Sequence, residues 1–494
     1  MNGRGDHSGG VGALALVLHA HMPYVVGFGT WPFGEEWLWE AIASVYLPLF
    51  ETIDGFPVTL GLTPVLCDQL ELVENGDGPE RQRLVRFVEE TRIGLVGSDR
   101  RSLRERGEGA LAEALASQEG QYRRAASALA AGWRPLARAR ALRGVEVLAS
   151  AATHPVLPIV ATDAARRFQV ATGIASHRRR FGGFGGGIWL PECAWRPGLE
   201  DALARCGVRY FCVDRTRAVA SGGAEHLEPL ALPGGLVAVP IDWELVRLVW
   251  DERSGYPTRA PYRDYYRGTE HHFNPWANDG LPYRPGRALA QAESDARDFV
   301  ARVASRLRDY QRATGRCGVV CCALDAELLG HWWAEGVEWL RSVLRLAPTV
   351  GIELVTLGEA ASRARREVAG LEEASWGSGK DLSTWDCAAA DEIVAAARVA
   401  ELRLLAAARR AVRAGCGDAP ALARAARELL ALQASDWAFM ATKRTAGPYP
   451  LERVRAHRRE FDAALAALEH CRPVERPTVG NLAPDLAVEH LCAP

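Results

Sequence analysis

The sequence lacks long apolar runs, and this absence excludes a large class of proteins. No segment reaches the roughly 18 consecutive apolar residues that a membrane-spanning helix needs. The apolar stretch at 11–18 is followed by His19 and His21 and by no small-residue cleavage site, so it does not match a signal peptide. We therefore expect a cytoplasmic protein with no membrane partner.

A basic excess is also missing from the chain. It has 59 Lys and Arg against 61 Asp and Glu, a formal net charge of −2. Proteins that bind a phosphate backbone usually carry a basic surface, so we expect no nucleic-acid partner. The 11 cysteines form no CxxC pair and no regular framework, which favours free buried thiols in a reducing cytoplasm.

The remaining composition is that of an ordinary globular protein. The 494 residues are 48% apolar and 24% charged, which is enough for two or more structural units with ample core. The polar residues 1–10 are expected to be disordered. We expect a monomer or a small homo-oligomer, and we expect no cofactor.

Short apolar runs recur along the chain, and each ends close to a polar residue. The runs are 13–18, 187–190, 209–213, 237–241, 318–324 and 352–355, which lead to His19, Glu192, Asp214, Asp242, Asp325 and Thr356. Buried parallel strands have this continuous apolar pattern, and a barrel of such strands carries its active site where their carboxyl ends meet. The pattern predicts an α/β, TIM-like barrel with a polar rim.

Helical patterns fill the intervals between these runs. They are clearest at 108–130, 287–313 and 334–346. The stretch at about 80–143 is too long for one crossover helix and predicts a helical insertion in a barrel that covers 11–387. Ala, Leu and Arg then dominate, which predicts a helical domain over 388–472, followed by a surface tail at 473–494; no internal repeat is present.

Two of the strand ends place a carboxylate among indole rings. Glu192 lies within Gly-Ile-Trp-Leu-Pro-Glu-Cys-Ala-Trp at 187–195, and Asp325 precedes Trp332 and Trp333. A lone Asp after a strand is more often a helix N-cap or an ion-pair partner. Two carboxylates on one rim, however, supply the acid and the nucleophile that glycosidic cleavage requires, while indoles stack on sugar faces.

His19 and His21 are two positions apart on one predicted strand, so both face the same side. Three interpretations are open. With Asp242 or Asp214 the pair would bind a metal ion, as in a polysaccharide deacetylase or a zinc mannosidase; alternatively, the two are satisfied core histidines. In the third interpretation they donate hydrogen bonds to sugar hydroxyls.

Four segments in order along the chain resemble the motifs of glycoside hydrolase family 57. They are His-Ala-His-Met-Pro-Tyr at 19–24, Trp-Leu-Pro-Glu-Cys-Ala at 189–194, Leu-Asp-Ala-Glu-Leu-Leu-Gly-His-Trp-Trp at 324–333 and Ser-Trp-Gly at 375–377. Four more resemble the 1,4-α-glucan branching enzymes of that family: Glu-Glu-Trp-Leu at 35–38, Thr-His-Pro at 153–155, Gly-Tyr-Pro at 255–257 and Ser-Asp-Trp at 435–437. The similarity extends from about 14 to 468.

The resemblance implies an incomplete (β/α)7 barrel, a helical insertion and a C-terminal helical domain that closes over the cleft. It implies α-glucan chains as donor and acceptor, and no metal. Glu192 would form a covalent glycosyl-enzyme, and Asp325 would be the general acid and then the base. In a retaining mechanism the two carboxyl groups lie about 5 to 5.5 Å apart. We expect apolar walls of Trp332 and Trp333 to raise the pKa of Asp325.

The resemblance also implies further contacts with the glucan. The residues expected to bind it are His19, His21, Asp242, Trp250, Trp376, Trp385 and Asp436, whereas His154 and His331 are expected to orient their neighbours. The simpler alternative for any of the three Trp residues is core or interface packing. For Asp436 it is a helix N-cap or an interdomain ion pair.

Three features depart from the branching pattern. An Arg typically precedes the position of Asp242, but this chain has Ile241, so a sugar-binding cation is missing. Thr258 replaces a glycine, and the loop at 215–236 has no aromatic residue to shield the intermediate from water. We thus predict a branching enzyme, with an α-amylase-type hydrolase or a 4-α-glucanotransferase as alternatives. A glucan-binding protein with degraded chemistry is a further class.

Overall fold

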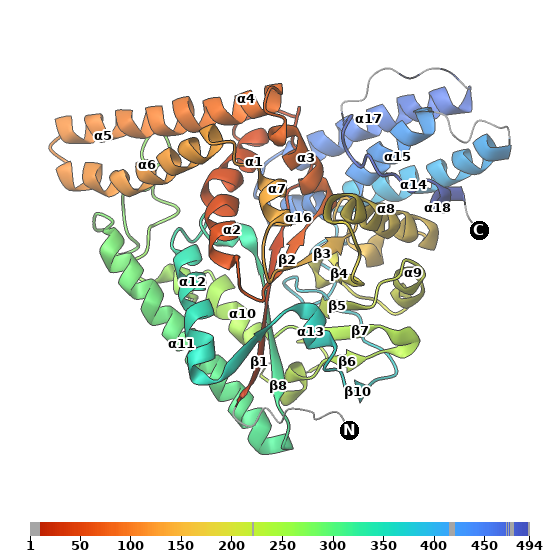
Figure 1. Ribbon diagram of the computed structural model, residues 1–494. Coiled ribbons are helices and arrows are strands. Elements are labelled where there is room, and N and C mark those ends of the chain that lie inside the picture. The colour runs from red at the N-terminus through yellow and green to blue at the C-terminus, as the bar shows by residue number, and fades with distance from the viewer. Residues whose placement is uncertain are drawn as a thin grey trace.

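A curled sheet of parallel strands forms the centre of the protein in the computed structural model (Figure 1). The structure describes residues 10–219, 222–413, 420–470, 472, 474 and 479–492, so the expected disorder at 1–9 lies outside the described residues. The strands are β1 (Gly12–Ala20), β2 (Thr59–Leu62), β3 (Glu146–Ser150), β4 (Gly187–Trp189), β5 (Tyr210–Val213), β6 (Leu230–Ala231), β7 (Val237–Pro240), β8 (Gly318–Asp325), β9 (Ile352–Val355) and β10 (Arg366–Glu367).

The parallel strands follow the order β7-β5-β4-β3-β2-β1-β8, and β9 pairs with the first half of β1. β6 runs antiparallel to β7 at one edge, and β10 extends that edge. Within the described residues β7 and β8 share no ladder, and the N–H of Asp242 donates one hydrogen bond to the carbonyl of Cys321 at 2.8 Å. The predicted incomplete barrel is therefore confirmed.

Alternate residues of each strand face the inside of the barrel. On β1 these are Ala13, Ala15 and Val17, which pack in one buried cluster with Val239 of β7 and Cys321 of β8. The intervening residues of β1 and β8 face outward and belong to the cluster that includes residues of α11 (Pro285–Thr314). Continuing the alternation carries the inner face to His19, His21 and Asp325 at the carboxyl ends.

Helices cover the outer face of the sheet. After the first strands come α1 (Glu35–Ala41), a π-helical turn (Ile42–Tyr46), α2 (Leu47–Ile53) and α3 (Pro64–Glu74); later crossovers contain α8 (Asp163–Phe181), α9 (Leu199–Arg205), α10 (Trp243–Trp250), α11, α12 (Gly336–Leu346) and α13 (Leu357–Ala361). Thr162 caps α8 by accepting the N–H of Ala165 at 3.2 Å. Gly173 lets α8 lie against β3, because a Cβ there would meet the carbonyl of Ser150 at 1.9 Å.

A helical layer separates β2 from β3 and lies on one side of the barrel mouth (Figure 1). Its members are α4 (Pro79–Arg86), a π-helical segment (Phe87–Gly94), α5 (Leu95–Glu105), α6 (Gly109–Ala130) and α7 (Pro135–Arg140). Arg92 and Tyr122 of this layer both bond to Glu40 of α1, at 2.9 and 2.8 Å. These contacts hold the layer against the segment that follows β1.

Helices after the barrel form a second group on the other side of the mouth (Figure 1). They are α14 (Asp391–Arg413), α15 (Pro420–Leu432), α16 (Ser435–Lys443) and α17 (Tyr449–Glu469). The described part of the tail, with α18 (Glu489–Cys492), is not a free surface arm. Val479, Leu482 and Leu491 are fully buried, and the N–H of Ala483 donates to Asp68 of α3 at 2.7 Å.

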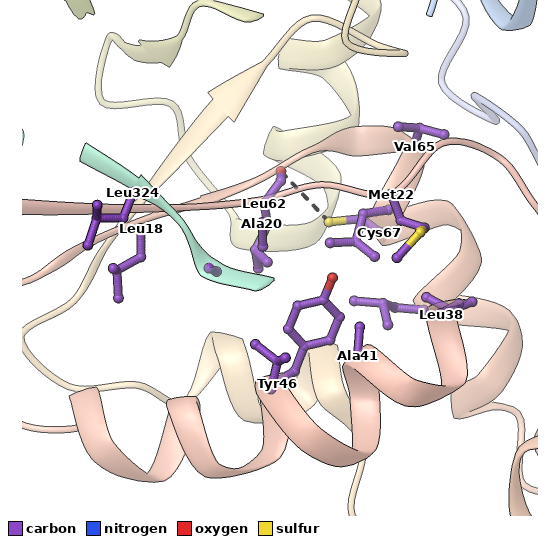
Figure 2. Packing of buried hydrophobic residues seen from close by; sticks show 14 of the residues in the cluster. Leu18, Ala20, Met22, Leu38, Ala41, Tyr46, Leu62, Val65, Cys67 and Leu324 are labelled. Atoms are coloured by element: carbon purple, nitrogen blue, oxygen red, sulfur yellow. Dashed lines mark hydrogen bonds between the residues drawn. The ribbon is translucent and has the colours of Figure 1, made fainter. Parts of the chain in front are cut away.

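The mouth of the barrel rests on a dense apolar cluster. Figure 2 shows Tyr46 rising from its helix toward the ends of β1 and β2, near Ala20 and Leu62. Its ring is fully buried, yet its hydroxyl reaches the polar rim, where it donates to Glu327 at 2.6 Å.

Among the described residues, no helix combines the length and apolar character needed to cross a lipid bilayer.

Candidate active site

Glu192 follows β4 in a short helical turn (Pro191–Cys193) and has a left-handed backbone, with φ 62° and ψ 20°. Such a conformation is costly for a residue with a side chain and is found mostly where function requires it. The turn directs the carboxylate into the mouth, where Oε2 accepts the indole N–H of Trp376 at 2.7 Å and Oε1 accepts the hydroxyl of Ser435 at 2.9 Å. Burial raises the pKa of Glu192, and these two donors act against that rise.

Asp325 ends β8, directly beside His19 in the sheet register. Burial raises the pKa of Asp325 well above its usual range, and the nearby charges of Glu327, Glu192 and Asp436 raise it further. The predicted rise is therefore present, but Trp333 does not supply the wall. It is buried against Tyr262 in the core, so the neighbouring carboxylates make the second contribution.

Glu327 is a third carboxyl group in the mouth, for which the sequence motifs implied no role. Its Oε1 accepts the hydroxyl of Tyr46 at 2.6 Å and the N–H of His21 at 3.1 Å. Burial raises the pKa of Glu327 to about 7, against the opposing effects of the Tyr46 hydroxyl and His21. The only sequence signal for Glu327 was its position two residues after Asp325, at the end of β8.

His19, His154 and Ser435 form a hydrogen-bonded chain that ends at Glu192. The Nε2 atoms of the two histidines are 3.0 Å apart, and His154 Nδ1 is 2.9 Å from the hydroxyl of Ser435. Burial lowers the pKa of both histidines well below the usual range, so both rings are neutral. His19 also stacks on Trp189 at a centroid distance of 4.3 Å.

The pKa of His21 is shifted upward, in contrast to the pKa values of His19 and His154. Its Nε2 lies 2.9 Å from Asp436 of α16, and its Nδ1 lies 3.1 Å from the hydroxyl of Thr63. Burial lowers the pKa of His21, but the Asp436 carboxylate, with Glu327 and Glu192, outweighs burial and raises it. The interdomain ion pair that was the simpler alternative for Asp436 is thus present.

Three of the four ring nitrogens of the histidine pair have protein partners, which bears on the metal alternative. Both nitrogens of His21 and Nε2 of His19 contact protein atoms. In the part of the chain that the structure describes, no group of three His, Cys, Asp or Glu side chains is placed to hold a metal ion. Asp242 and Asp214, the proposed third ligands, both have other partners.

Asp242 does not join the site. Ile241 lies in the inner cluster of the barrel, so the next side chain points outward. Asp242 is buried there and accepts a hydrogen bond from Nε of Arg306 on α11. The expectation that it binds sugar is wrong because the strand exit turns its carboxylate to the outer face.

A cation that no sequence motif indicated, Lys380, lies beside the inner face. Lys380 Nζ is 2.8 Å from Oδ2 of Asp214, which directly follows β5, and 3.4 Å from the carbonyl of Trp376. It also lies over the ring of Trp243. Trp243 and the carbonyl of Trp376 therefore both contact the ammonium group of Lys380. The site thus has a cation nearby, although Ile241 itself carries no charge.

The expected stacking residues divide into two kinds. Trp250 is 39% exposed and stacks on the half-buried Trp376 at a centroid distance of 6.3 Å, so these two rings form one partly exposed surface next to Glu192. Trp385 is 1% exposed and packs against Gly377, so it is an interface side chain and not a stacking surface. His331 contacts the hydroxyl of Tyr265 at 3.2 Å, and the expectation that it orients a catalytic group has no contact to support it among the described residues.

A cavity of about 540 Å³ opens from the site on the side of β8 and β1. Glu327 and Met22 belong to its lining, together with the aromatic side chains of Trp31, Tyr266 and Trp332. Two buried carboxyl groups in one mouth, exposed indoles and an adjoining cavity with aromatic lining together suit attack on a polymer of sugars.

Comparisons with known proteins agree with this chemistry. The family model described as "Glycosyl hydrolase family 57" matches residues 136–370, and that of "1,4-alpha-glucan branching enzyme, C-terminal" matches 397–483. The chain is 34% identical over 509 residues to a 1,4-alpha-glucan branching enzyme of Thermococcus kodakarensis, covering 91% of this chain and 73% of that protein. It is 33% identical over 505 residues to a probable 1,4-alpha-glucan branching enzyme of Mycobacterium tuberculosis, covering 92% and 93%.

A solved structure is similar over nearly the whole fold. The GH57-type branching enzyme of Pyrococcus horikoshii superposes with a TM-score of 0.86 at 30% identity, covering 97% of this chain and 94% of that one. The similarity therefore includes the barrel, the helical layer and the C-terminal helices.

Proposed function

The chain belongs to glycoside hydrolase family 57, and on that premise we propose that it acts as a 1,4-α-glucan branching enzyme. The motif resemblance predicted this family. The observation that carries the chemistry is the contrast between two carboxyl groups in one mouth. Glu192 accepts two hydrogen bonds that favour its ionised form, whereas Asp325 faces carboxylates that favour its protonated form.

In the first step Glu192 attacks the anomeric carbon of the donor chain. Asp325 gives its proton to the glycosidic oxygen, so the carbon–oxygen bond breaks as the ester to Glu192 forms. The freed part of the chain leaves with a 4-hydroxyl group. Trp376 and Ser435 hold the attacking carboxylate in position.

In the second step the ionised Asp325 removes the proton from a 6-hydroxyl group of the acceptor chain. The hydroxyl oxygen attacks the anomeric carbon, the ester breaks, and Glu192 returns as a carboxylate. Each of the two attacks inverts the configuration at the anomeric carbon. Two inversions together retain the original configuration. We expect the two carboxyl groups to be about 5 to 5.5 Å apart, as this mechanism requires.

Hydrolysis competes with branching at the second step, because water can replace the acceptor. The Tyr-less loop at 215–236 and Thr258 favour that competition. Incubation with amylose separates the two reactions: branching produces α-1,6 linkages without new reducing ends, and hydrolysis produces reducing ends alone. We expect α-1,6 linkages to exceed new reducing ends.

A matched pair of variants tests the assigned nucleophile. Glu192→Gln is expected to lose activity by at least a thousandfold, as removal of a nucleophile does. Glu373→Gln changes the same side chain at an exposed ion pair with Arg196 and serves as the control. Full turnover by Glu192→Gln would overturn the mechanism.

We further propose that the substrate is a glycogen-like glucan in the cytoplasm. The thiols support a reducing compartment, since the cysteines whose side chains the structure describes are all free. Cys212 and Cys321 approach within 3.9 Å between their sulfur atoms without a bridge.

A further inference from the structure

The cavity beside the active site has a wall of exposed aromatic rings. Tyr266 is 78% exposed, Trp31 is 57% exposed and Tyr265 is 41% exposed, and all three line the same cavity. The indole of Trp332 donates to the hydroxyl of Tyr266 at 3.4 Å. Single exposed rings are common on protein surfaces, but a cluster of them in a concave site usually marks a binding surface.

The segment that carries Tyr265 and Tyr266 is braced. Asp264 Oδ1 accepts the N–H groups of Tyr266 and Arg267 at 2.8 and 3.2 Å, and the side-chain amide of Asn274 donates to the carbonyls of Tyr265 and Arg267. Exposed rings on a braced segment are pre-organised, so binding a ligand there costs little conformational entropy.

The helical layer supplies further bracing and thus builds one side of the cavity. Arg263 donates to the hydroxyl of Ser117 on α6 at 3.1 Å. His271 Nδ1 lies 2.6 Å from Asp99 of α5. The position of the aromatic wall therefore depends on this helical layer, the insertion between β2 and β3. The insertion contributes no strand to the barrel.

Polar groups with fixed orientations lie among the rings. The carboxylate of Glu40 is held by Arg92 and Tyr122, and Gln121 and His331 also line the cavity. Planar rings beside amide, carboxylate and imidazole groups match the faces and hydroxyl groups of pyranose rings.

The position of the cavity identifies which part of the substrate it suits. It opens at Glu327, two residues beyond Asp325, and its edge continues along the same segment through Gly330 to Trp332. The Trp250–Trp376 surface lies at Glu192 instead. The acid–base group marks the side of the leaving and accepting chains, and the nucleophile marks the donor sugar.

We propose that this cavity binds the acceptor glucan chain, with sugar rings stacked on Tyr265, Tyr266 and Trp332. The inference rests on the proposed function. Its consequence is that the insertion, which neither forms the barrel nor supplies a catalytic carboxyl group, sets the acceptor preference of the enzyme.

A donor that needs no sugar on the acceptor side tests this assignment. α-Maltotriosyl fluoride loads Glu192 with release of fluoride, and added maltohexaose then competes with water for the glycosyl-enzyme. For Tyr266→Ala and Trp332→Ala the KM for maltohexaose is expected to rise about tenfold, the scale of one lost stacking contact. This rise is expected to exceed any fall in the rate of fluoride release.

Trp250→Ala is the matched control, because it removes an exposed ring from the other side of the mouth. It is expected to slow fluoride release more than it raises the KM for maltohexaose. If Tyr266→Ala and Trp332→Ala keep this KM within twofold of the wild-type value, while circular dichroism shows them folded, the acceptor assignment is overturned. A wild type that releases fluoride but forms no transfer product would instead overturn the proposed function.

Discussion

The hydroxyl of Ser435 donates a hydrogen bond to Glu192 Oε1 at 2.9 Å, which joins the C-terminal helices to the carboxylate at the end of β4. Since the hydroxyl has one proton, Nδ1 of His154 must donate to Ser435. Neutral His154 then accepts at Nε2 from His19. Nδ1 of His19 has no hydrogen-bond partner among the described residues, which fits this order of donors because the atom is left as a bare acceptor.

Removing the Ser435 hydroxyl breaks this chain at its last step. We expect Ser435→Ala to lower kcat/KM by about 10- to 100-fold, since a hydrogen bond to a charged group contributes about 1.5–3 kcal/mol. Ser435→Thr keeps the hydroxyl and is expected to recover most of the activity. Steady-state kinetics on amylose measure both, and equal losses in the two variants would show that packing at this position matters and the hydrogen bond does not.

The pH profile of kcat/KM reports on the two carboxyl groups. Activity needs ionised Glu192, so its acid limb follows the pKa of Glu192, and the basic limb follows loss of the Asp325 proton. Trp376→Phe removes a donor that stabilises the anion, so the pKa of Glu192 rises and the acid limb moves to higher pH. Trp250→Phe, which alters the neighbouring ring but no bond to Glu192, is expected to leave that limb in place.

Lys380 is expected to position the Trp376 segment. In Lys380→Met the buried carboxylate of Asp214 loses its cation, which destabilises the protein by about 3–5 kcal/mol. In the double variant Lys380→Met, Asp214→Asn the charge is gone, and the melting temperature is expected to recover. Activity is expected to stay low in the double variant, because the contact from Lys380 to the Trp376 carbonyl is still absent.

Recovery of both melting temperature and activity in the double variant would contradict the positioning role. It would mean that Lys380 only neutralises Asp214. Comparison of kcat with KM adds a second readout, since a displaced Trp376 lowers kcat through its bond to Glu192.

The strand ends were predictable because a buried parallel strand leaves a continuous apolar run, and its alternation carries His19, His21 and Asp325 to one face. The same alternation explains the error at Asp242, which follows an inward residue and so points outward. A polar residue that follows a strand belongs to the rim only if it continues the inward-facing positions of that strand.

Lys380 had no such signal, and Ser435 had only its place in the Ser-Asp-Trp segment at 435–437, which implied no role for its hydroxyl. Each reaches the site from a segment far along the chain, through contacts that depend on how the C-terminal helices and the 375–381 loop pack on the barrel. For the same reason the sequence showed Trp385 as aromatic but not as buried, and it did not show that the tail packs on α3.

Arg180 of α8 links three distant parts of the chain. It contacts Asp68 Oδ1 at 2.6 Å, both side chains are 1% exposed, and the other carboxylate oxygen of Asp68 accepts the N–H of Ala483 in the C-terminal tail. Arg180→Met leaves a buried charge unpaired, so we expect it to destabilise the protein by about 3–5 kcal/mol. Thermal unfolding measures the loss, and Asp68→Asn in the same chain is expected to restore most of it.

The pH dependence of that loss separates charge from packing. Burial already raises the pKa of Asp68 to about 6, even though Arg180 opposes the rise. Without Arg180 the pKa rises further, so the folded variant takes up a proton more readily than the unfolded chain as the pH falls. The penalty should therefore be smaller at pH 5 than at pH 8, whereas a penalty that is equal at both pH values would assign the loss to the missing side-chain volume.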